Sequence, residues 1–158
     1  MKKALLATVA MVSAGYGVYR WRTHETRLPA PAAATVDDDL VTDRLWIDHI
    51  PRGERDTIQI FVAITDEPVG VFESASRWKG AFEFFRYEQH GDELRILFPQ
   101  TNTRDKVRAR ATHCNRGGMD YCLELEGSSR GVKQYYSRDG WEVGNTNDVN
   151  ALVRKISD

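Results

Sequence analysis

The stretch that decides the fold is residues 78–98, WKGAFEFFRYEQHGDELRILF. Aromatic and β-branched residues that alternate between two faces favour a strand, and a glycine supplies the positive φ that a two-residue turn needs. Residues 92–98 alternate in this way, and an aromatic-rich run precedes them on the other side of His90-Gly91. The sequence therefore predicts a β-hairpin that turns at these two residues.

This turn also predicts which residues of the hairpin face each other. Tyr87 is expected opposite Leu94, and Phe85 opposite Ile96. Directly opposed residues share a face, as do residues two apart along a strand, so all four side chains point to one face of the hairpin. We expect that face to be the inside of the protein.

The aromatic strand contains one conflict of parity. Phe82 and Phe84 cannot share a face with Phe85 and Tyr87 in a regular strand. A β-bulge at Phe84-Phe85 would turn Phe82 inward and leave Glu83 in solvent. Without a bulge, Glu83 points into the core. The sequence favours the bulge and leaves the other arrangement open.

The composition is that of one globular domain. The chain has 158 residues, of which 41% are hydrophobic and 28% charged, a balance typical of folded rather than disordered proteins. Residues 1–34 carry an excess of Lys and Arg, which leaves the rest of the chain net acidic. An acidic body argues against nucleic acid as a partner.

Residues 1–22 have the pattern of a secretory signal peptide or a short membrane anchor. Lys2 and Lys3 precede the apolar run 4–18, which is shorter than the about 20 residues that a membrane-spanning helix needs. The flank 19–22, YRWR, is typical of a membrane interface and would favour an uncleaved segment that holds the protein at the membrane. We expect export across the inner membrane to a periplasmic, membrane-tethered or secreted location, with cleavage left open.

A linker and one folded domain follow this segment. Residues 23–40 combine Pro29, Pro31 and an acidic cluster, and they are predicted to stay extended. Residues 41–158 then contain short runs with strand alternation between turn residues. Besides the hairpin of residues 78–98, these runs are residues 44–50, 56–65, 69–73, 106–114, 120–127, 132–136 and 141–143. The last segment, residues 147–157, has the apolar spacing of an amphipathic helix.

A second hairpin, made of residues 106–114 and 120–127, predicts a disulfide. If the apolar residues of both strands face inward, a three-residue loop at residues 117–119 places Cys114 directly opposite Cys122. Opposed residues of an antiparallel pair are close enough for a disulfide. Export would supply the oxidising compartment in which the bond persists.

The order of these elements predicts an all-β fold. About eight short antiparallel strands, joined by local hairpins and ended by one helix, make an up-and-down barrel or a strongly curled sheet. This arrangement resembles the calycin group, the lipocalin-like and fatty-acid-binding-protein-like barrels, over residues 41–157. The glycine of the lipocalin signature Gly-x-Trp is absent, because Arg44 stands two residues before Trp46. The resemblance lies in architecture and implies a binding module for a small apolar or amphipathic ligand.

No motif in the sequence points to catalysis or to a cofactor. The chain has no G-x-S-x-G, no H-E-x-x-H and no glycine-rich phosphate loop after a strand. Its cysteines and histidines lack the paired short spacings of a zinc site. We therefore expect neither an enzyme nor a bound cofactor or metal.

The candidate ligand-binding residues are the aromatic, aliphatic and histidine positions that are expected to face inward. They are Phe82, Phe85, Tyr87, Ile96, Trp141, His49 and His113. Both histidines are expected to be buried and hydrogen-bonded. An eight-stranded barrel has room for its own side chains or for one small ligand. The alternative is therefore an envelope structural or interaction protein with a filled core, which binds a protein partner through its surface.

Overall fold

The computed structural model of the protein describes residues 37–157. The predicted signal or anchor segment, residues 1–22, lies outside the described residues, as does most of the predicted linker. Within the described range no helix is long and apolar enough to cross a membrane.

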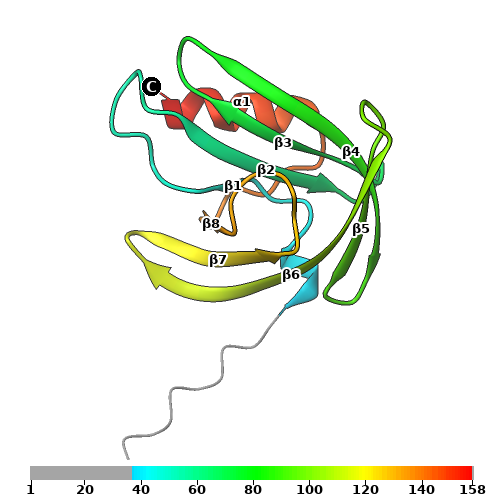
Figure 1. The fold of residues 1–158 in the computed structure, drawn as a ribbon. Coiled ribbons are helices and arrows are strands. Elements are labelled where there is room, and N and C mark those ends of the chain that lie inside the picture. The colour runs from blue at the N-terminus through cyan, green and yellow to red at the C-terminus, as the bar shows by residue number, and fades with distance from the viewer. Residues whose placement is uncertain (1–36, 158) are drawn as a thin grey trace, which may run out of the picture. The chain divides into compact units, whose positions relative to one another are not determined.

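Eight antiparallel strands close into a barrel in which chain neighbours are also sheet neighbours (Figure 1). The strands are β1 (Trp46–Ile47), β2 (Ile58–Ile64), β3 (Val69–Ala75), β4 (Gly80–His90), β5 (Glu93–Phe98), β6 (Thr103–Arg116), β7 (Met119–Glu126) and β8 (Gln134–Ser137). The barrel closes where Ile47 of β1 pairs with Tyr136 of β8. The predicted strand at residues 141–143 is wrong, because Glu142 forms only an isolated bridge to Arg44. The prediction of an antiparallel β-fold with a C-terminal helix is confirmed.

Two helices complete the described chain. The short 3-10 helix η1 (Asp38–Leu40) precedes β1, and α1 (Thr146–Ser157) follows β8. Asn145 caps α1, since its side-chain oxygen accepts a hydrogen bond of 2.9 Å from the main-chain N–H of Asn147. Such a cap satisfies a donor that has no partner within the helix.

Aromatic side chains fill the barrel interior. Five rings with almost no exposure to solvent form its centre: Phe61, Phe72, Phe85, Phe98 and Tyr135. The centroids of neighbouring rings lie between 5.1 and 6.2 Å apart, which is the range of favourable aromatic contacts. Their burial makes the interior a packed hydrophobic core.

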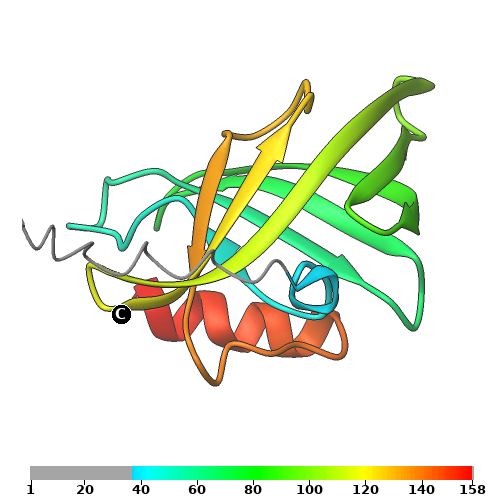
Figure 2. The same cartoon turned by 90° about the horizontal axis from the view of Figure 1, so that it is seen from below.

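A second hydrophobic core lies between the outer face of the barrel and α1. Strand β2 is buried on both faces, because Phe61 points into the barrel while Ile60 and Val62 point toward α1. The helix contributes Val149 and Leu152 to this outer core. Figures 1 and 2 show α1 lying against the strands from outside. The amphipathic face of α1 is thus used to cover one side of the sheet.

The central hairpin has the predicted faces but not the predicted register. Tyr87 pairs with Ile96 rather than with Leu94, which pairs with Gln89. The shift equals two residues, so every side chain keeps its face. The turn lies one residue later than predicted, at Gly91-Asp92, where Gly91 adopts a φ of 59°. A positive φ at this position suits glycine.

The predicted β-bulge in β4 is wrong. The pairing of β3 with β4 runs without interruption, with Val71 opposite Phe84 and Glu73 opposite Phe82. Phe82 and Phe84 therefore lie on the outer face, where 64% and 49% of their surface is exposed. Glu83 points inward instead, and its carboxylate accepts a hydrogen bond of 2.6 Å from the Arg130 side chain.

The second hairpin forms with a different loop from the one predicted. Thr112, not Cys114, pairs with Cys122, and the ladder is irregular between His113 and Arg116. The turn consists of two residues, Gly117-Gly118, both with positive φ. The predictions of a three-residue loop and of directly opposed cysteines are therefore wrong.

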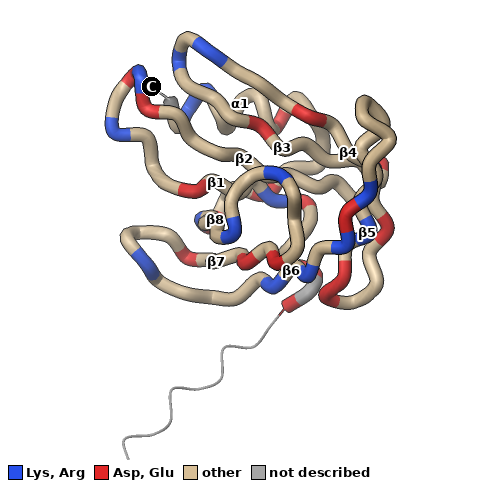
Figure 3. Tube along the Cα trace, in the orientation of Figure 1, with Lys and Arg blue, Asp and Glu red and all other residues tan. Residues whose placement is uncertain are grey.

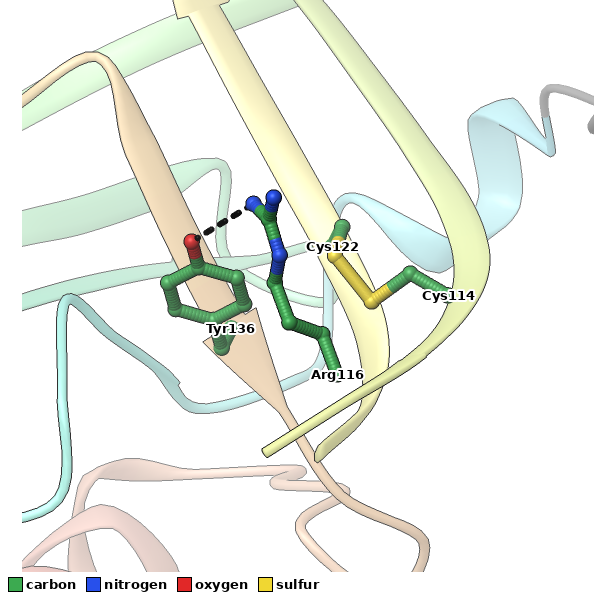
Figure 4. Close-up of a disulfide and its surroundings, with 4 residues drawn as sticks. All are labelled: Cys114, Arg116, Cys122 and Tyr136. Carbon is green, nitrogen blue, oxygen red and sulfur yellow. Dashed lines mark hydrogen bonds between the residues drawn. A yellow bond between two sulfur atoms is a disulfide. The ribbon is translucent and has the colours of Figure 1, made fainter. Parts of the chain in front are cut away.

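The predicted disulfide is nevertheless formed. Cys114 and Cys122 are bonded, with their Cα atoms 5.7 Å apart (Figure 4). Beside it, the Arg116 side chain donates a hydrogen bond of 3.3 Å to the hydroxyl of Tyr136 in β8. The irregularity of the ladder brings the two cysteines together diagonally.

Candidate binding site

Three of the seven predicted ligand-binding residues meet inside the barrel. Phe85, Tyr87 and Ile96 are almost fully buried in the inner core. The Tyr87 hydroxyl is buried without a hydrogen-bond partner among the described residues. Burial, together with the nearby charge of Asp43, raises the pKa of Tyr87 to about 12. This hydroxyl therefore stays protonated among the aromatic and aliphatic side chains of the inner core.

Phe82 and Trp141, the other two aromatic residues predicted to bind the ligand, lie outside the barrel interior. Phe82 is on the outer face of β4, for the reason given above. Trp141 packs against the outer core, and the Arg138 guanidinium lies 5.8 Å from its ring centroid. The prediction that both rings line the interior is wrong, because each belongs to the opposite side of the barrel wall.

Neither histidine is buried in the core as predicted. His49 follows β1 in a loop, where its ring nitrogens lie 2.9 Å from Asp48 and 3.2 Å from Asp56. Partial burial lowers the pKa of His49, but the hydrogen bonds and charges of these carboxylates outweigh it and raise the pKa overall. His113 is exposed, and its ring lies tilted against that of Tyr121, with centroids 4.7 Å apart. The histidines are therefore not brought together with each other or with the interior set.

A groove opens on the outer face, between α1 and the strands β2, β3 and β4. Its volume is about 310 Å³. It is lined by Val62, Ile64, Val69, Gly70, Val71, Glu73, Phe82, Phe84, Thr146, Val149 and Asn150. The floor and one wall are apolar, and the size matches the lower range of small-molecule sites.

The groove exists because α1 covers β2 and leaves β4 bare. Val149 faces the groove from the helix, while Phe82 and Phe84 form its opposite rim. The two rings meet edge to face, with centroids 5.1 Å apart. Exposed aromatic rings beside an apolar hollow are typical of a binding surface. The wrong parity of these two phenylalanines was the sequence signal that could have located it.

Glu73 is the acidic group of the groove. Its side chain lies on β3 opposite Phe82 and is partly buried. No hydrogen bond or ion pair joins its carboxylate to another described residue, and burial raises its pKa. The groove therefore combines an apolar surface with one uncompensated carboxyl group, which can accept a hydrogen bond or attract a cation.

A second hollow, on the outer face of β4, β5 and β6, is larger and has more charged residues in its lining. Its volume is about 710 Å³, and Arg86, Leu97 and Arg104 form a row across its three strands. Lys106 and Arg95 in the same hollow both form ion pairs with Glu93. Charges of both signs line this surface, which suits it to contact with solvent.

Comparison with other proteins assigns no function to the site. The chain matches no protein-family model, no curated protein and no solved structure. Among residues 37–157 no group of three or more His, Cys, Asp or Glu side chains is arranged to hold a metal ion. The resemblance to calycin barrels rests on architecture.

Proposed function

We propose that the protein is a binding module for a small amphipathic molecule, and that the ligand occupies the outer groove rather than the barrel interior. The observation that carries this proposal is the unpaired Glu73 carboxyl beside the apolar lining of the groove. Burial of apolar surface contributes roughly 25 cal/mol per Å², and one or two polar groups fix orientation. A ligand with an apolar body and a cationic or hydrogen-bond-donating end fits this arrangement.

The packing of the interior supports a site on the surface. The ring of Phe85 lies between those of Phe61, Phe72 and Phe98, all within 6.1 Å. A ligand inside the barrel would have to displace these rings from favourable contacts. The outer groove takes a ligand without such a rearrangement. We extend the proposal to an exported, lipocalin-like module, for which the disulfide is consistent with an oxidising compartment.

A series of ligands with one chain length tests the proposal. Dodecylammonium, dodecanol and dodecanoate share an apolar body and differ in the charge of the head group. We expect saturable binding with affinity in that order, measured by calorimetry below the micellar concentration. Methyl NMR shifts should involve Val71 and Val149 of the groove. Shifts confined to Ile96 and its inner-core neighbours, or no saturable binding, would contradict the proposed site.

A pair of glutamate variants separates the role of the carboxyl group from overall charge. Glu73→Gln should weaken dodecylammonium binding by up to about fivefold, the effect of a partly exposed ion pair, and leave dodecanol unchanged. Glu88→Gln is the matched control, because Glu88 is exposed on β4 outside the groove. Equal losses in both variants would mean that the groove carboxyl has no specific role.

A further inference from the structure

Half of β4 has a strand neighbour on one side only. It pairs with β3 from Gly80 to Arg86, but with β5 only from Arg86 to His90. The first half of β4 is thus an open edge within an otherwise closed barrel. In Figure 1 this half belongs to the β3–β4 hairpin at the upper left.

The main-chain groups that face the open side can be identified. The N–H of Tyr87 donates to the carbonyl of Pro68, on the β3 side, at 3.1 Å. Because these groups alternate along an antiparallel strand, Gly80, Phe82 and Phe84 direct theirs away from β3.

A side chain already occupies one end of this edge. With its amide turned so that both bonds form, Gln100 pairs with the N–H and the carbonyl of Phe84, at 3.0 and 2.9 Å. Gly80 and Phe82 then remain, with main-chain groups that point to the open side of β4, where no neighbouring strand lies. Any added strand must therefore pair with these two.

The side chains at this edge do not protect it. Exposed edges normally carry charges, prolines or bulges that prevent pairing with another chain. Here Trp78 in the turn before β4, and Phe82 and Phe84 on its outer face, are exposed over 69%, 64% and 49% of their surface. An open edge with exposed aromatic rings is suited to the addition of another strand.

We propose that the open edge of β4 pairs with the same edge of a second copy of this chain, antiparallel, about a twofold axis at Ala81. Gly80 then lies opposite Phe82 of the second copy, and Lys79 opposite Glu83. Each pair occurs twice because of the symmetry. This interface goes beyond the proposed function and does not depend on a ligand in the groove.

Each of these pairs is complementary. Gly80 and Phe82 form hydrogen-bonded pairs, in which the ring of Phe82 covers the glycine. Lys79, which makes no side-chain bond to another described residue, meets the Glu83 carboxylate of the other copy. Figure 3 shows the charges involved, positive at the hairpin tip and negative further along β4.

The register also agrees with the limits of the open edge. Pairing through main-chain hydrogen bonds ends at Phe82, so Phe84 keeps its bonds to Gln100. It begins at Gly80, the first residue of β4. A register centred on Phe82 would instead place Gly80 of the second copy where the Gln100 side chain lies. The axis at Ala81 is therefore the one that leaves existing contacts intact.

A cysteine on the proposed axis tests both the contact and its register. Ala81 is exposed and faces itself at a non-hydrogen-bonded position, where Cα atoms are about 4.5 Å apart, a distance at which disulfides form. In the full chain, treated in cells with a mild thiol oxidant that accepts the two electrons, Ala81→Cys should give a covalent dimer. Glu88→Cys, exposed on the paired half of the same strand, should give on the order of tenfold less.

Charge variants and solution measurements complete the test. In the Ala81→Cys chain, Lys79→Glu should reduce the dimer at least severalfold, whereas Lys79→Arg should keep it. The unmodified isolated chain should show concentration-dependent dimerisation in sedimentation velocity, reduced by Phe82→Lys. Retention of the Cys114–Cys122 bond checks that each variant is folded. Equal cross-linking at Ala81 and Glu88, or a monomer at all concentrations, overturns the proposal and leaves the edge to a different protein.

Discussion

Gly70 illustrates how a single residue limits the packing of the barrel. It lies on the inner side of β3, and a Cβ atom there would come within 2.2 Å of the Phe85 ring and 2.4 Å of the Val62 carbonyl oxygen. We predict that Gly70→Ala lowers the free energy of unfolding by at least about 1–3 kcal/mol, the range for overpacked cores. Urea denaturation measures this loss.

The matched control is Gly53→Ala, since a Cβ at Gly53 meets nothing within 4 Å. Its free energy of unfolding should change by no more than about 0.5 kcal/mol. Comparable losses in the two variants would mean that the close approach of Phe85 to β3 does not limit stability.

The raised pKa of Glu73 predicts how the stability of the protein changes with pH. Burial raises its pKa in the folded protein above the value in the unfolded chain. Between the two values the folded state binds more protons, so this residue lowers stability as pH rises through that interval. Glu73→Gln should remove this contribution, and the variant should gain stability relative to the parent as the pH rises above about 4, the ordinary range for a Glu side chain. Urea denaturation across this range, compared with Glu88→Gln, measures the difference. A difference between parent and variant that does not change with pH would rule the effect out.

Among the structural elements, the β6–β7 hairpin depends on its disulfide. The bond closes a loop with a sequence separation of 8, for which chain entropy gives a stabilisation of about 2–3 kcal/mol. We predict that Cys114→Ala combined with Cys122→Ala lowers the free energy of unfolding by about this amount. The closed ladder should persist, because β8 still pairs with β1.

A reducing agent provides the control for this variant. It should bring the parent protein to the stability of the double variant and leave the double variant unchanged. Circular dichroism should report a similar strand content for all three samples. Loss of the β-sheet signal on reduction would show instead that the barrel requires the bond in order to fold.

The elements also show what local sequence can and cannot predict. Alternation identified the inward faces of Tyr87 and Ile96, because a strand has a strict period of two. It could not fix their pairing, because a shift of two residues preserves every face. The orientation of Glu83 depended on Arg130, which is 47 residues away in the sequence. An ion pair of this kind leaves no local pattern.

At the scale of the whole barrel, the candidate site was missed for a related reason. The spacing of Val149 and its neighbours predicted an amphipathic helix, but not the strands that it would cover. The groove arises from the position of α1 over β2 and beside β4. The predicted β-bulge assigned Phe82 to the wrong side of the barrel wall, and the expectation that Trp141 faces inward was also wrong.

The location of the protein is a prediction about the whole chain, and a fusion to the full chain can test it. Lys2 and Lys3 with the apolar run 4–18 predict export, and the Cys114–Cys122 bond fits an oxidising compartment. A reporter enzyme that is active only outside the cytoplasm, fused after Asp158, should therefore be active. A matched chain without residues 2–18 should leave the reporter inactive. Alkylation and mass spectrometry of the protein from its native compartment should find no free thiol, whereas the shortened chain, kept in the reducing cytoplasm, should contain two. An inactive reporter on the full chain, or two free thiols in the protein taken from its native compartment, would exclude this location.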